Sequence, residues 1–374
     1  MKYFERYRKP QLTITKGGER IQGPIRRILL IQLGDIGDVV LAIPTLRSLK
    51  ESYPSVHITV AVRDKASELM HLCPWCDDVL PIKKEKLSPM DWVVKHARFF
   101  RTLRSKAYDL VFDMRTGTRG GILSFLSGAR IRVGFTALED TWRNWLFTHL
   151  VYPPMDMPML HMAHYHLLLL DRYGLTINPR WPRLHIDHYH AGRVNDLLQK
   201  ENVPAQLPLI AVQPFSLWRY KEWGEEKFKH LIKRIVSAYR VGILICGSAA
   251  ERPRICRMMN TLASDPVYNL AGRTTIAEYT ALLARCAFFI GCDSAGVHLA
   301  AAVQTPTATL YGPTSPDAWA PREAGHIVIR NDMDCVPCRQ KGCRNSGSSL
   351  CLARLSVDAV VQRITPLLSN LTVS

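Results

Sequence analysis

The sequence predicts an α/β protein of two domains, each a mainly parallel β-sheet covered by helices. Its length of 374 residues exceeds what one hydrophobic core ordinarily supports and suits two domains. From Ile25 onward, short apolar runs alternate with helical patterns, which is the order typical of parallel sheets. The alternation stops in a proline-containing segment and then begins again. We therefore place the domain boundary between residues 185 and 186.

The first half opens with a strand, a glycine-containing turn and a helix. Residues 27–33, RILLIQL, form the continuous apolar run of a strand that is buried on both faces. Residues 1–24 are basic and polar without a period, and we treat them as an extension of unknown role. The elements expected next are a helix at 38–52, a strand at 57–63, a helix at 96–108, a strand at 109–114, a loop at 115–121, a strand at 129–135 and a helix at 161–174.

The second half repeats the alternation. Gly174 is a candidate C-cap that separates it from the helix before. The expected strands are 208–214, 241–247, 287–292 and 307–312. The expected helices are 190–201, 225–239, 250–263, 276–285, 297–303 and 356–369.

The formal net charge of +17 comes from 49 Lys and Arg against 32 Asp and Glu, and the charges are spread along the chain. This balance favours an anionic partner: nucleic acid, a phospholipid surface or a phosphorylated substrate and its acceptor. No helix-turn-helix, zinc-finger or RNP signature accompanies the charge, so we do not expect nucleic acid.

The sequence also indicates a compartment. Residues 1–20 contain no apolar core segment, so we expect no signal peptide. The longest uncharged stretch, Ser294 to Pro316, contains glycines, prolines and a histidine, which argues against a membrane span. We expect a cytoplasmic protein whose ten cysteines are mostly reduced.

The turn GDIGD, residues 34–38, stands between the first strand and the first helix. A dinucleotide fingerprint needs G-x-G-x-x-G, whereas this turn has only G-x-x-G, and Asp35 and Asp38 would repel a pyrophosphate. A carboxylate at this edge of a parallel sheet can accept a proton from an attacking hydroxyl. It can equally cap the helix, and position alone favours the cap.

Two segments of the second half are candidate phosphate sites. Ser216, Arg219 and Lys221 follow a strand and precede a helix, although the same segment can be read as an ordinary helix start. The turn DSAG at 293–296 joins a buried strand to a helix that contains His298. Small residues and free N–H groups at a helix start suit a diphosphate.

Four cysteines lie close together near the C-terminus, and DMD at 332–334 precedes them. We read DMD as a loop rather than a metal-binding motif. The four thiols fit a structural metal site, reduced thiols or a disulfide, and their spacing matches no common zinc finger. They are Cys335, Cys338, Cys343 and Cys351.

Together these segments resemble glycosyltransferase family 9, the ADP-heptose:lipopolysaccharide heptosyltransferases. The resemblance runs from about Ile25 to the end of the chain and is carried by the motifs GDIGDVVLAIPTLRSLKESYP, ARIRVGF, HMAHYHLLLLDRYGL, KEWGEEKF, LAGRTTIAEYTALLARC and GCDSAGVHLAAAVQTPTATLYGPTSP. It implies a GT-B fold of two facing Rossmann-like domains: residues 25–185 for the acceptor and residues 186–355 for the nucleotide sugar. A C-terminal helix within 356–374 would cross back to pack on the first domain.

The resemblance also implies roles for residues. The family is inverting and metal-independent, with no catalytic cofactor. Asp38 would deprotonate the acceptor hydroxyl, which leaves Asp35 as a cap or a neighbour of Asp38, and Lys221 would neutralise the leaving ADP. Leu217 and the order Ala295-Gly296 depart from the family pattern. The residues implied to bind the donor are Ser216, Lys221, Glu251 at the ribose, Thr274 beside the adenine, and Asp293, Ser294, Ala295, Gly296 and His298 around the diphosphate.

The implied reaction is transfer of a heptose from ADP-L-glycero-D-manno-heptose to the inner core of lipopolysaccharide. The acceptor would lie at the anionic inner membrane face, where we expect peripheral docking through the helix of Arg98, Arg101, Arg104 and Lys106 and the stretch TWRNWLF at 141–147. The alternatives are another nucleotide sugar or a protein acceptor on the same fold, a non-catalytic ADP- or glycan-binding protein, and a Rossmann oxidoreductase.

Overall fold

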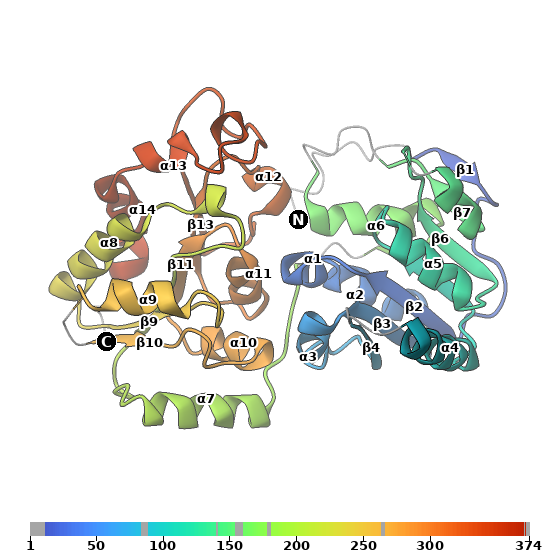
Figure 1. Cartoon of the computed structure of the whole chain (residues 1–374), viewed down its shortest axis with the longest axis horizontal. Helices are drawn as coiled ribbons and strands as arrows, with labels where there is room; N and C mark the ends of the chain where they lie inside the picture. The colour runs from blue at the N-terminus through green and yellow to red at the C-terminus, as the bar shows by residue number, and fades with distance from the viewer. Residues whose placement is uncertain are drawn as a thin grey trace. The chain divides into compact units, whose positions relative to one another are not determined.

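A computed structural model of the chain divides into two compact units, residues 1–182 and 183–374. The predicted boundary lies at residue 185. The structure describes residues 12–83, 89–139, 141–153, 160–177, 181–262, 266–369 and 371 (Figure 1). Among the helices within these ranges, none has the length and apolar character needed to cross a bilayer.

The first unit contains a seven-stranded sheet with the order β1-β7-β6-β5-β2-β3-β4. Every neighbouring pair is parallel except β1 and β7, which are antiparallel. The strands are β1 (Ile14–Lys16), β2 (Arg27–Gln32), β3 (His57–Arg63), β4 (Asp78–Ile82), β5 (Leu110–Asp113), β6 (Ile131–Phe135) and β7 (His149–Val151).

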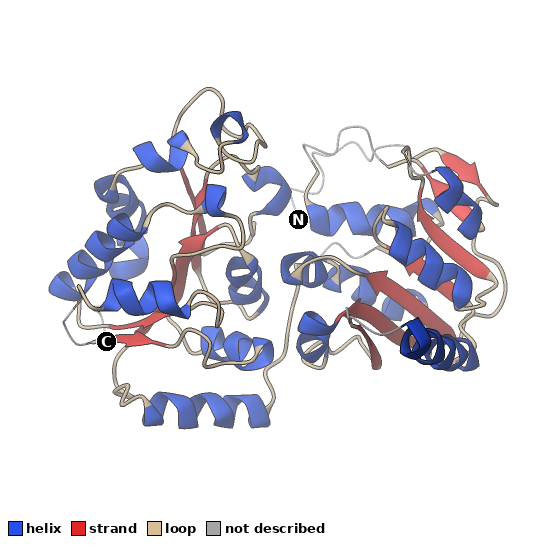
Figure 2. Cartoon of the chain, in the orientation of Figure 1, coloured by secondary structure: helices blue, strands red, loops and turns tan. Residues whose placement is uncertain are grey.

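Helices lie on both sides of this sheet (Figure 2). They are α1 (Ile36–Leu41), α2 (Ile43–Ser52), α3 (Ser67–Met70), α4 (Pro89–Ser105), α5 (Thr118–Leu126) and α6 (Met162–Arg172), with 3-10 turns η2 (Asp64–Ala66) and η3 (Thr141–Leu146). The helix predicted at 38–52 is therefore two helices, because α1 ends at Ala42 and α2 begins with Pro44 in its first turn.

The loop predicted at 115–121 is wrong, because α5 begins at Thr118. A pair of glycines usually indicates a turn, but here the glycines serve helix packing. A Cβ at Gly120 would lie against the carboxylate of Asp113, and one at Gly121 would come within 3.0 Å of Arg143 Cγ. The glycines let α5 approach the end of β5 closely.

Part of the predicted N-terminal extension also belongs to the first unit. Ile14–Lys16 forms β1 and pairs with β7, so the domain begins before residue 25. A three-residue strand at the sheet edge has too little apolar sequence to stand out. Residues 1–11 of the predicted extension lie outside the described residues.

The second unit contains a six-stranded, wholly parallel sheet with the order β10-β9-β8-β11-β12-β13. Its strands are β8 (Leu209–Gln213), β9 (Gly242–Ile245), β10 (Val267–Asn269), β11 (Phe288–Cys292), β12 (Thr307–Tyr311) and β13 (His326–Arg330). Its helices are α7 (His188–Lys200), α8 (Glu225–Ala238), α9 (Arg252–Met259), α10 (Ile276–Ala284), α11 (Ala295–Ala302), α12 (Pro316–Trp319), α13 (Leu350–Arg354) and α14 (Val357–Ser369), with 3-10 turns η5 (Arg219–Lys221) and η6 (Cys343–Asn345).

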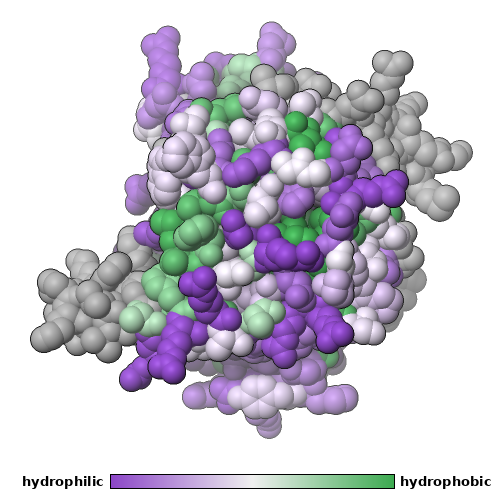
Figure 3. Space-filling model, turned by 90° about the vertical axis from the view of Figure 1, so that its right-hand side faces the viewer, coloured by the Kyte–Doolittle hydropathy of each residue, from purple (hydrophilic) through white to green (hydrophobic). Residues whose placement is uncertain are grey.

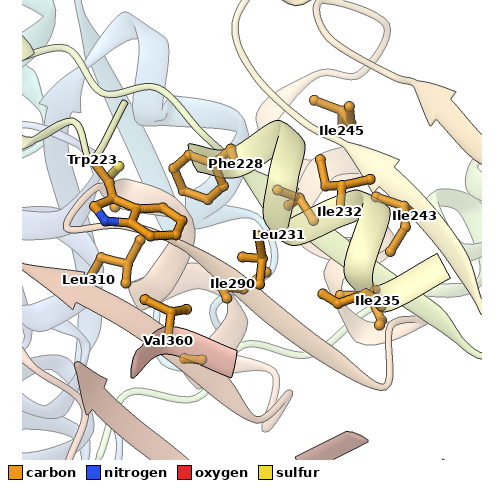
Figure 4. Close-up of a cluster of buried hydrophobic side chains, with 14 of the residues drawn as sticks. Trp223, Phe228, Leu231, Ile232, Ile235, Ile243, Ile245, Ile290, Leu310 and Val360 are labelled. Atoms are coloured by element: carbon orange, nitrogen blue, oxygen red, sulfur yellow. The ribbon is translucent and has the colours of Figure 1, made fainter. Parts of the chain in front are cut away.

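One apolar cluster fills the space between this sheet and helices α8 and α14 (Figure 4). Phe228 and Ile232 of α8 meet Ile290 and Leu310 of the central strands, and Trp223 closes one end of the cluster. These side chains are at most 2% exposed. The burial of this apolar surface is the main favourable contribution to folding of the unit.

The prediction that the C-terminal helix packs on the first domain is corrected by this cluster. Val360, Ile364 and Leu368 of α14 are at most 1% exposed and lie in the core of the second unit. The helix contacts α8 and β13. The apolar face of α14 is therefore buried in the core of the second unit.

Each sheet has a point at which the strand order reverses. In the first unit, the chain runs from β2 outward to β4 and then returns to β5 on the other side of β2. In the second, it runs from β8 outward to β10 and returns to β11 on the other side of β8. Ligands of open α/β sheets bind beyond the carboxyl ends of the strands at such points.

Candidate functional site

The residues predicted for chemistry follow the strands that flank the two reversal points. Asp38 follows β2, while Ser216 and Lys221 follow β8. The DSAG turn begins directly after β11. The fold thus brings the predicted residues to the edges where a ligand is expected.

Asp38 is the third residue of α1 and is held from two sides. Its Oδ2 accepts a hydrogen bond of 2.8 Å from the backbone N–H of Asp35 and lies 3.2 Å from Arg115 Nη1. Its side chain is 15% exposed. A carboxylate fixed in this way is oriented yet accessible to a substrate hydroxyl.

Asp35 has a different environment. It is the N-cap residue of α1, and its Oδ1 lies 2.6 Å from Lys65 Nζ and 3.1 Å from Arg63 Nη1. Partial burial raises the pKa of this carboxyl, but the hydrogen bond and charge of Lys65, together with Arg63 and Arg115, outweigh burial and hold the pKa below its usual value. Asp35 is ionised and already paired with two cations.

Arg143 orders the loop that carries Arg115. This arginine is fully buried and donates from Nη2 to Asp113 Oδ2 at 2.6 Å and to the Arg115 carbonyl at 2.7 Å. It also donates to the carbonyls of Gly117 and Phe135. Burial raises the pKa of Asp113 to about 6, although the charge of Arg143 opposes this shift. We call Asp113 and Arg143 the buried clamp.

A second buried pair supports the turn before Asp38. Gln32 Oε1 accepts from Gly34 N–H at 3.1 Å, and Gln32 Nε2 lies 3.2 Å from His166 Nε2. Burial lowers the pKa of His166 to about 4, despite the nearby charge of Asp38. His166 is therefore neutral at neutral pH and accepts the hydrogen bond from Gln32.

In the second unit, Lys221 and Asp293 form an ion pair across the reversal point. Lys221 Nζ lies 2.7 Å from Asp293 Oδ2, and Thr314 Oγ1 donates to the same oxygen at 2.7 Å. The side chains of Lys221 and Asp293 are 18% and 4% exposed. Two residues that were predicted from separate motifs, 72 positions apart, are thus in direct contact.

The loop before Lys221 is braced by a second pair. Glu222 binds Arg254 through two hydrogen bonds of 3.0 and 2.7 Å, and Glu222 Oε1 also accepts from the N–H of Ser216 at 3.3 Å. The Arg254 guanidinium lies 3.7 Å from the centre of the Phe215 ring. Ser216 is buried, whereas Leu217 is 72% exposed.

The DSAG turn has the geometry of an anion site. Ser294 is the N-cap of α11, and its buried Oγ has no hydrogen-bond partner within the described part of the chain. A Cβ at Gly296 would lie against Gln213 Oε1 and Tyr279 Oη, which explains glycine at this position. Ala295 is the first residue of the helix, and His298 is buried in its first turn and a half. The free N–H groups at the start of α11 can bind an anion.

The residues predicted at the nucleoside occupy the neighbouring strand ends. Glu251 precedes α9, after β9, and its Oε2 accepts from the N–H and Oγ of Ser248 at 2.7 and 2.9 Å. Thr274 lies after β10, next to Thr275, which caps α10. Both are at the same edge of the sheet as Lys221 and Asp293.

The four cysteines near the C-terminus are free thiols in the structure. Cys351 is buried on α13, and Cys343 Sγ accepts from the N–H of Leu350 at 3.3 Å. Within the ranges that the structure describes, no three His, Cys, Asp or Glu side chains are grouped as metal ligands. The structural metal stays a prediction, which metal analysis of the purified protein would test.

Sequence reasoning missed Arg115, Arg143, Arg254 and Thr314. Each contacts a partner that is distant in sequence, so no spacing or motif reveals it. The one available signal was position, because Arg115 directly follows the strand DLVFDM and Thr314 lies two residues after TATLYG.

Comparison with known proteins decides the family. The model of glycosyltransferase family 9 (heptosyltransferase) matches residues 96–348. The chain belongs to this family. As a family 9 member it is a glycosyltransferase. The chain is 25% identical over 343 residues to lipopolysaccharide heptosyltransferase 3 of Escherichia coli. The aligned region covers 88% of this chain and 96% of that relative.

Solved structures of the family share its fold. The ADP-heptose lipopolysaccharide heptosyltransferase II of E. coli is 21% identical with a TM-score of 0.76, over 92% of this chain and 99% of that one. The E. coli heptosyltransferase WaaC, with ADP-2-deoxy-2-fluoro heptose, is 19% identical with a TM-score of 0.69, over 91% and 99%. This likeness confirms the predicted GT-B fold with Rossmann-like domains.

Proposed function

We propose that this family 9 enzyme transfers a heptose from ADP-heptose to the inner core of lipopolysaccharide. The names of its relatives, lipopolysaccharide heptosyltransferases, support the acceptor, and the solved WaaC complexes with ADP and an ADP-heptose analogue support the donor. The observation that carries the proposal is the Lys221–Asp293 pair beside the free start of α11, at the reversal point of the second sheet.

The diphosphate of the donor would bind at this pair. Lys221 carries three N–H donors, of which Asp293 takes one, so two remain for phosphate oxygens. The start of α11 contributes positive partial charge, and the unpaired Ser294 Oγ can donate to a third oxygen. These groups supply several oriented hydrogen-bond donors for the diphosphate, which supports a metal-independent mechanism.

Asp38 would act as general base. Its carboxylate accepts the proton of the acceptor hydroxyl as the hydroxyl oxygen attacks the anomeric carbon. The bond from that carbon to the diphosphate breaks on the opposite face, so the configuration inverts, and ADP leaves with its charge stabilised by Lys221. Arg115 Nη1, 3.2 Å from Asp38 Oδ2, orients the carboxylate.

The cations around the GDIGD turn suit an acidic acceptor. Arg63, Lys65 and Arg115 lie beside Asp35 and Asp38, and each side chain is close to half exposed. The inner core carries phosphates and acidic sugars, for which paired cations provide binding groups. Since this acceptor is anchored in a membrane, we also propose that the protein works in peripheral contact with the anionic inner membrane face.

Mass spectrometry tests the proposed function. The full chain is incubated with defined truncated lipopolysaccharide cores and ADP-heptose, and in parallel with other nucleotide sugars. A mass gain of one heptose on one core is expected, and Asp38→Asn should form this product far more slowly. Transfer from a different nucleotide sugar, or to a protein and no core, would replace the proposed substrates.

A further inference from the structure

One face of the first unit exposes large apolar side chains. Six of the ten that the described part of the chain exposes lie between residues 122 and 152. Ile122 and Phe125 of α5 are 38% and 51% exposed, and Trp142 and Trp145 of η3 are 51% and 83% exposed. Because α5 packs against η3, these four exposed side chains stand on two neighbouring elements.

Arginines accompany these side chains. Arg98, Arg101 and Arg104 are exposed on α4, which also packs against α5, and Arg119 is exposed on α5 itself. Residues 97–105, 118–126 and 141–146 contain no aspartate or glutamate. We call the surface formed by these four arginines with Ile122, Phe125, Trp142 and Trp145 the aromatic–arginine face. Figure 3 shows hydrophobic side chains among hydrophilic ones on the end of the first unit that carries α4 and α5.

The exposed tryptophans stand on a well-anchored segment. Between them in sequence, Arg143 is fully buried in the clamp and lies 4.4 Å from the centre of the Phe147 ring, which is also buried. Asn144 exchanges two hydrogen bonds with the backbone of Ala137. The segment is therefore held by its polar and charged side chains, while both indoles point away from the core. Core packing does not explain these tryptophans.

We propose that the aromatic–arginine face docks on an anionic lipid bilayer. Trp and Phe side chains insert favourably at the level of the headgroups, and arginines bind lipid phosphates. A second copy of the chain is a poorer occupant, because these three segments would bring arginines together and carry no carboxylate of their own to pair with them. This inference rests on the proposed function, because docking would bring the enzyme to its membrane-anchored acceptor.

The face also shares its elements with the site of Asp38. Arg143 belongs to η3 and binds the Arg115 carbonyl, while α5 begins three residues after Arg115. Arg115 in turn contacts Asp38. A bilayer on this face would therefore be held at a fixed distance from the carboxylate that is proposed to activate the acceptor.

Vesicle co-sedimentation of the full chain tests the inference. We expect binding to vesicles of phosphatidylethanolamine and phosphatidylglycerol, and much weaker binding to phosphatidylcholine alone. Trp142→Ser with Trp145→Ser should weaken binding about tenfold or more. Arg98→Gln and Arg101→Gln should each weaken it about fivefold, which corresponds to about 1 kcal/mol per cation. Tyr189→Ser, at 69% exposure on α7, and Lys233→Gln on α8 are matched controls that should bind normally.

Two further measurements separate the possible results. Heptosyl transfer to a soluble, truncated core should be unchanged in the tryptophan variant, whereas transfer to the same core in vesicles should fall. Unchanged vesicle binding by this variant overturns the inference. So does a dimer of the full chain that the same substitutions dissociate, because the face would then bind a second copy. If no heptose is transferred but vesicle binding still depends on the tryptophans, the proposed function fails and the docking surface stands.

Discussion

Asp38 and Asp35 lie three positions apart but have different charged partners. Asp35 is bound by two cations and caps α1, while Asp38 has one cationic neighbour and an oriented, partly accessible carboxylate. The difference supports the proposal that Asp38 is the proton acceptor. Position in the sequence alone favoured a cap for either residue, and the structure gives the cap position to Asp35.

Replacing Asp38 with asparagine should therefore act on turnover alone. Asparagine keeps the size of the side chain and a carbonyl oxygen for the Asp35 N–H but cannot take a proton at neutral pH. We expect turnover to fall by about 10²- to 10⁴-fold, the usual contribution of a general base. ADP affinity, measured by calorimetry, should persist. Near-normal turnover of Asp38→Asn would rule out Asp38 as the general base. Asp35→Asn is the control, for which we expect a smaller loss of turnover.

Replacing Lys221 with alanine should act on nucleotide binding. The substitution removes a charged hydrogen-bond donor and leaves the carboxylate of Asp293, at 4% side-chain exposure, with the hydroxyl of Thr314 as a donor. We expect ADP to bind about 10- to 100-fold more weakly, as for loss of a charged hydrogen bond. Lys221→Arg should retain part of the affinity, because the charge remains. Unchanged ADP affinity in Lys221→Ala would place the diphosphate elsewhere.

The close packing of α5 against the end of β5 connects the fold of the first unit to the candidate site. Gly120→Ala would insert a methyl group against the carboxylate of Asp113 and disturb the buried clamp. Overpacking of this kind costs about 1–3 kcal/mol, and we expect a lower melting temperature and reduced turnover with normal ADP affinity. Gly117→Ala is the matched control, because a Cβ there meets nothing within 4 Å. Equal melting temperatures for the two variants would contradict this account of the glycines.

Helix α6 makes stability depend on pH. Its buried His166 has a pKa lowered to about 4, whereas the unfolded chain binds that proton near pH 6.5. The unfolded state therefore binds more protons between these values, and the stability contributed by neutral His166 is lost as pH falls. At pH 5 the loss is about 2 kcal/mol relative to pH 7. Denaturant unfolding at both pH values should show a smaller loss in His166→Gln, and an equal loss would exclude His166 as the cause.

The strands differ in how readily sequence predicts them. All eight that have long apolar runs, from β2 to β12, lie inside the sheets, where both faces are buried. The strands that sequence analysis missed are β1, β4, β7, β10 and β13. Four of them are sheet edges, and β7 has only three residues next to an edge. A strand with one open side needs little apolar sequence, so periodicity does not detect it.

The residues of the candidate site also differ in how readily sequence predicts them. Residues on strand-to-helix turns, such as Asp38 and Asp293, could be predicted because turn chemistry and family motifs are local. Arg115, Arg143 and Thr314 could not, because their contacts depend on which strands are neighbours. The order of strands in the sheets is what brings them to the predicted residues.

The two units have separate cores, and the C-terminal helix completes the second one. We therefore expect residues 183–374, expressed alone, to fold cooperatively and to bind ADP with an affinity close to that of the full chain. Every residue proposed to bind the nucleotide lies in this segment, and α14 covers its core. Circular dichroism melting and calorimetry would check this. Removal of residues 356–374 from the same segment should abolish folding, and a folded product would contradict the packing of α14.

The pairing of Lys221 with Asp293 has a consequence for how a strongly cationic enzyme distinguishes its anions. A diphosphate meets at this position a lysine whose charge is already balanced, so its attraction depends on oriented N–H groups at short range. The aromatic–arginine face instead presents exposed arginines to solvent, and the attraction of exposed charges is screened within about 10 Å at 0.1 M salt. We therefore expect added salt to weaken the proposed binding to vesicles while the affinity for ADP changes little.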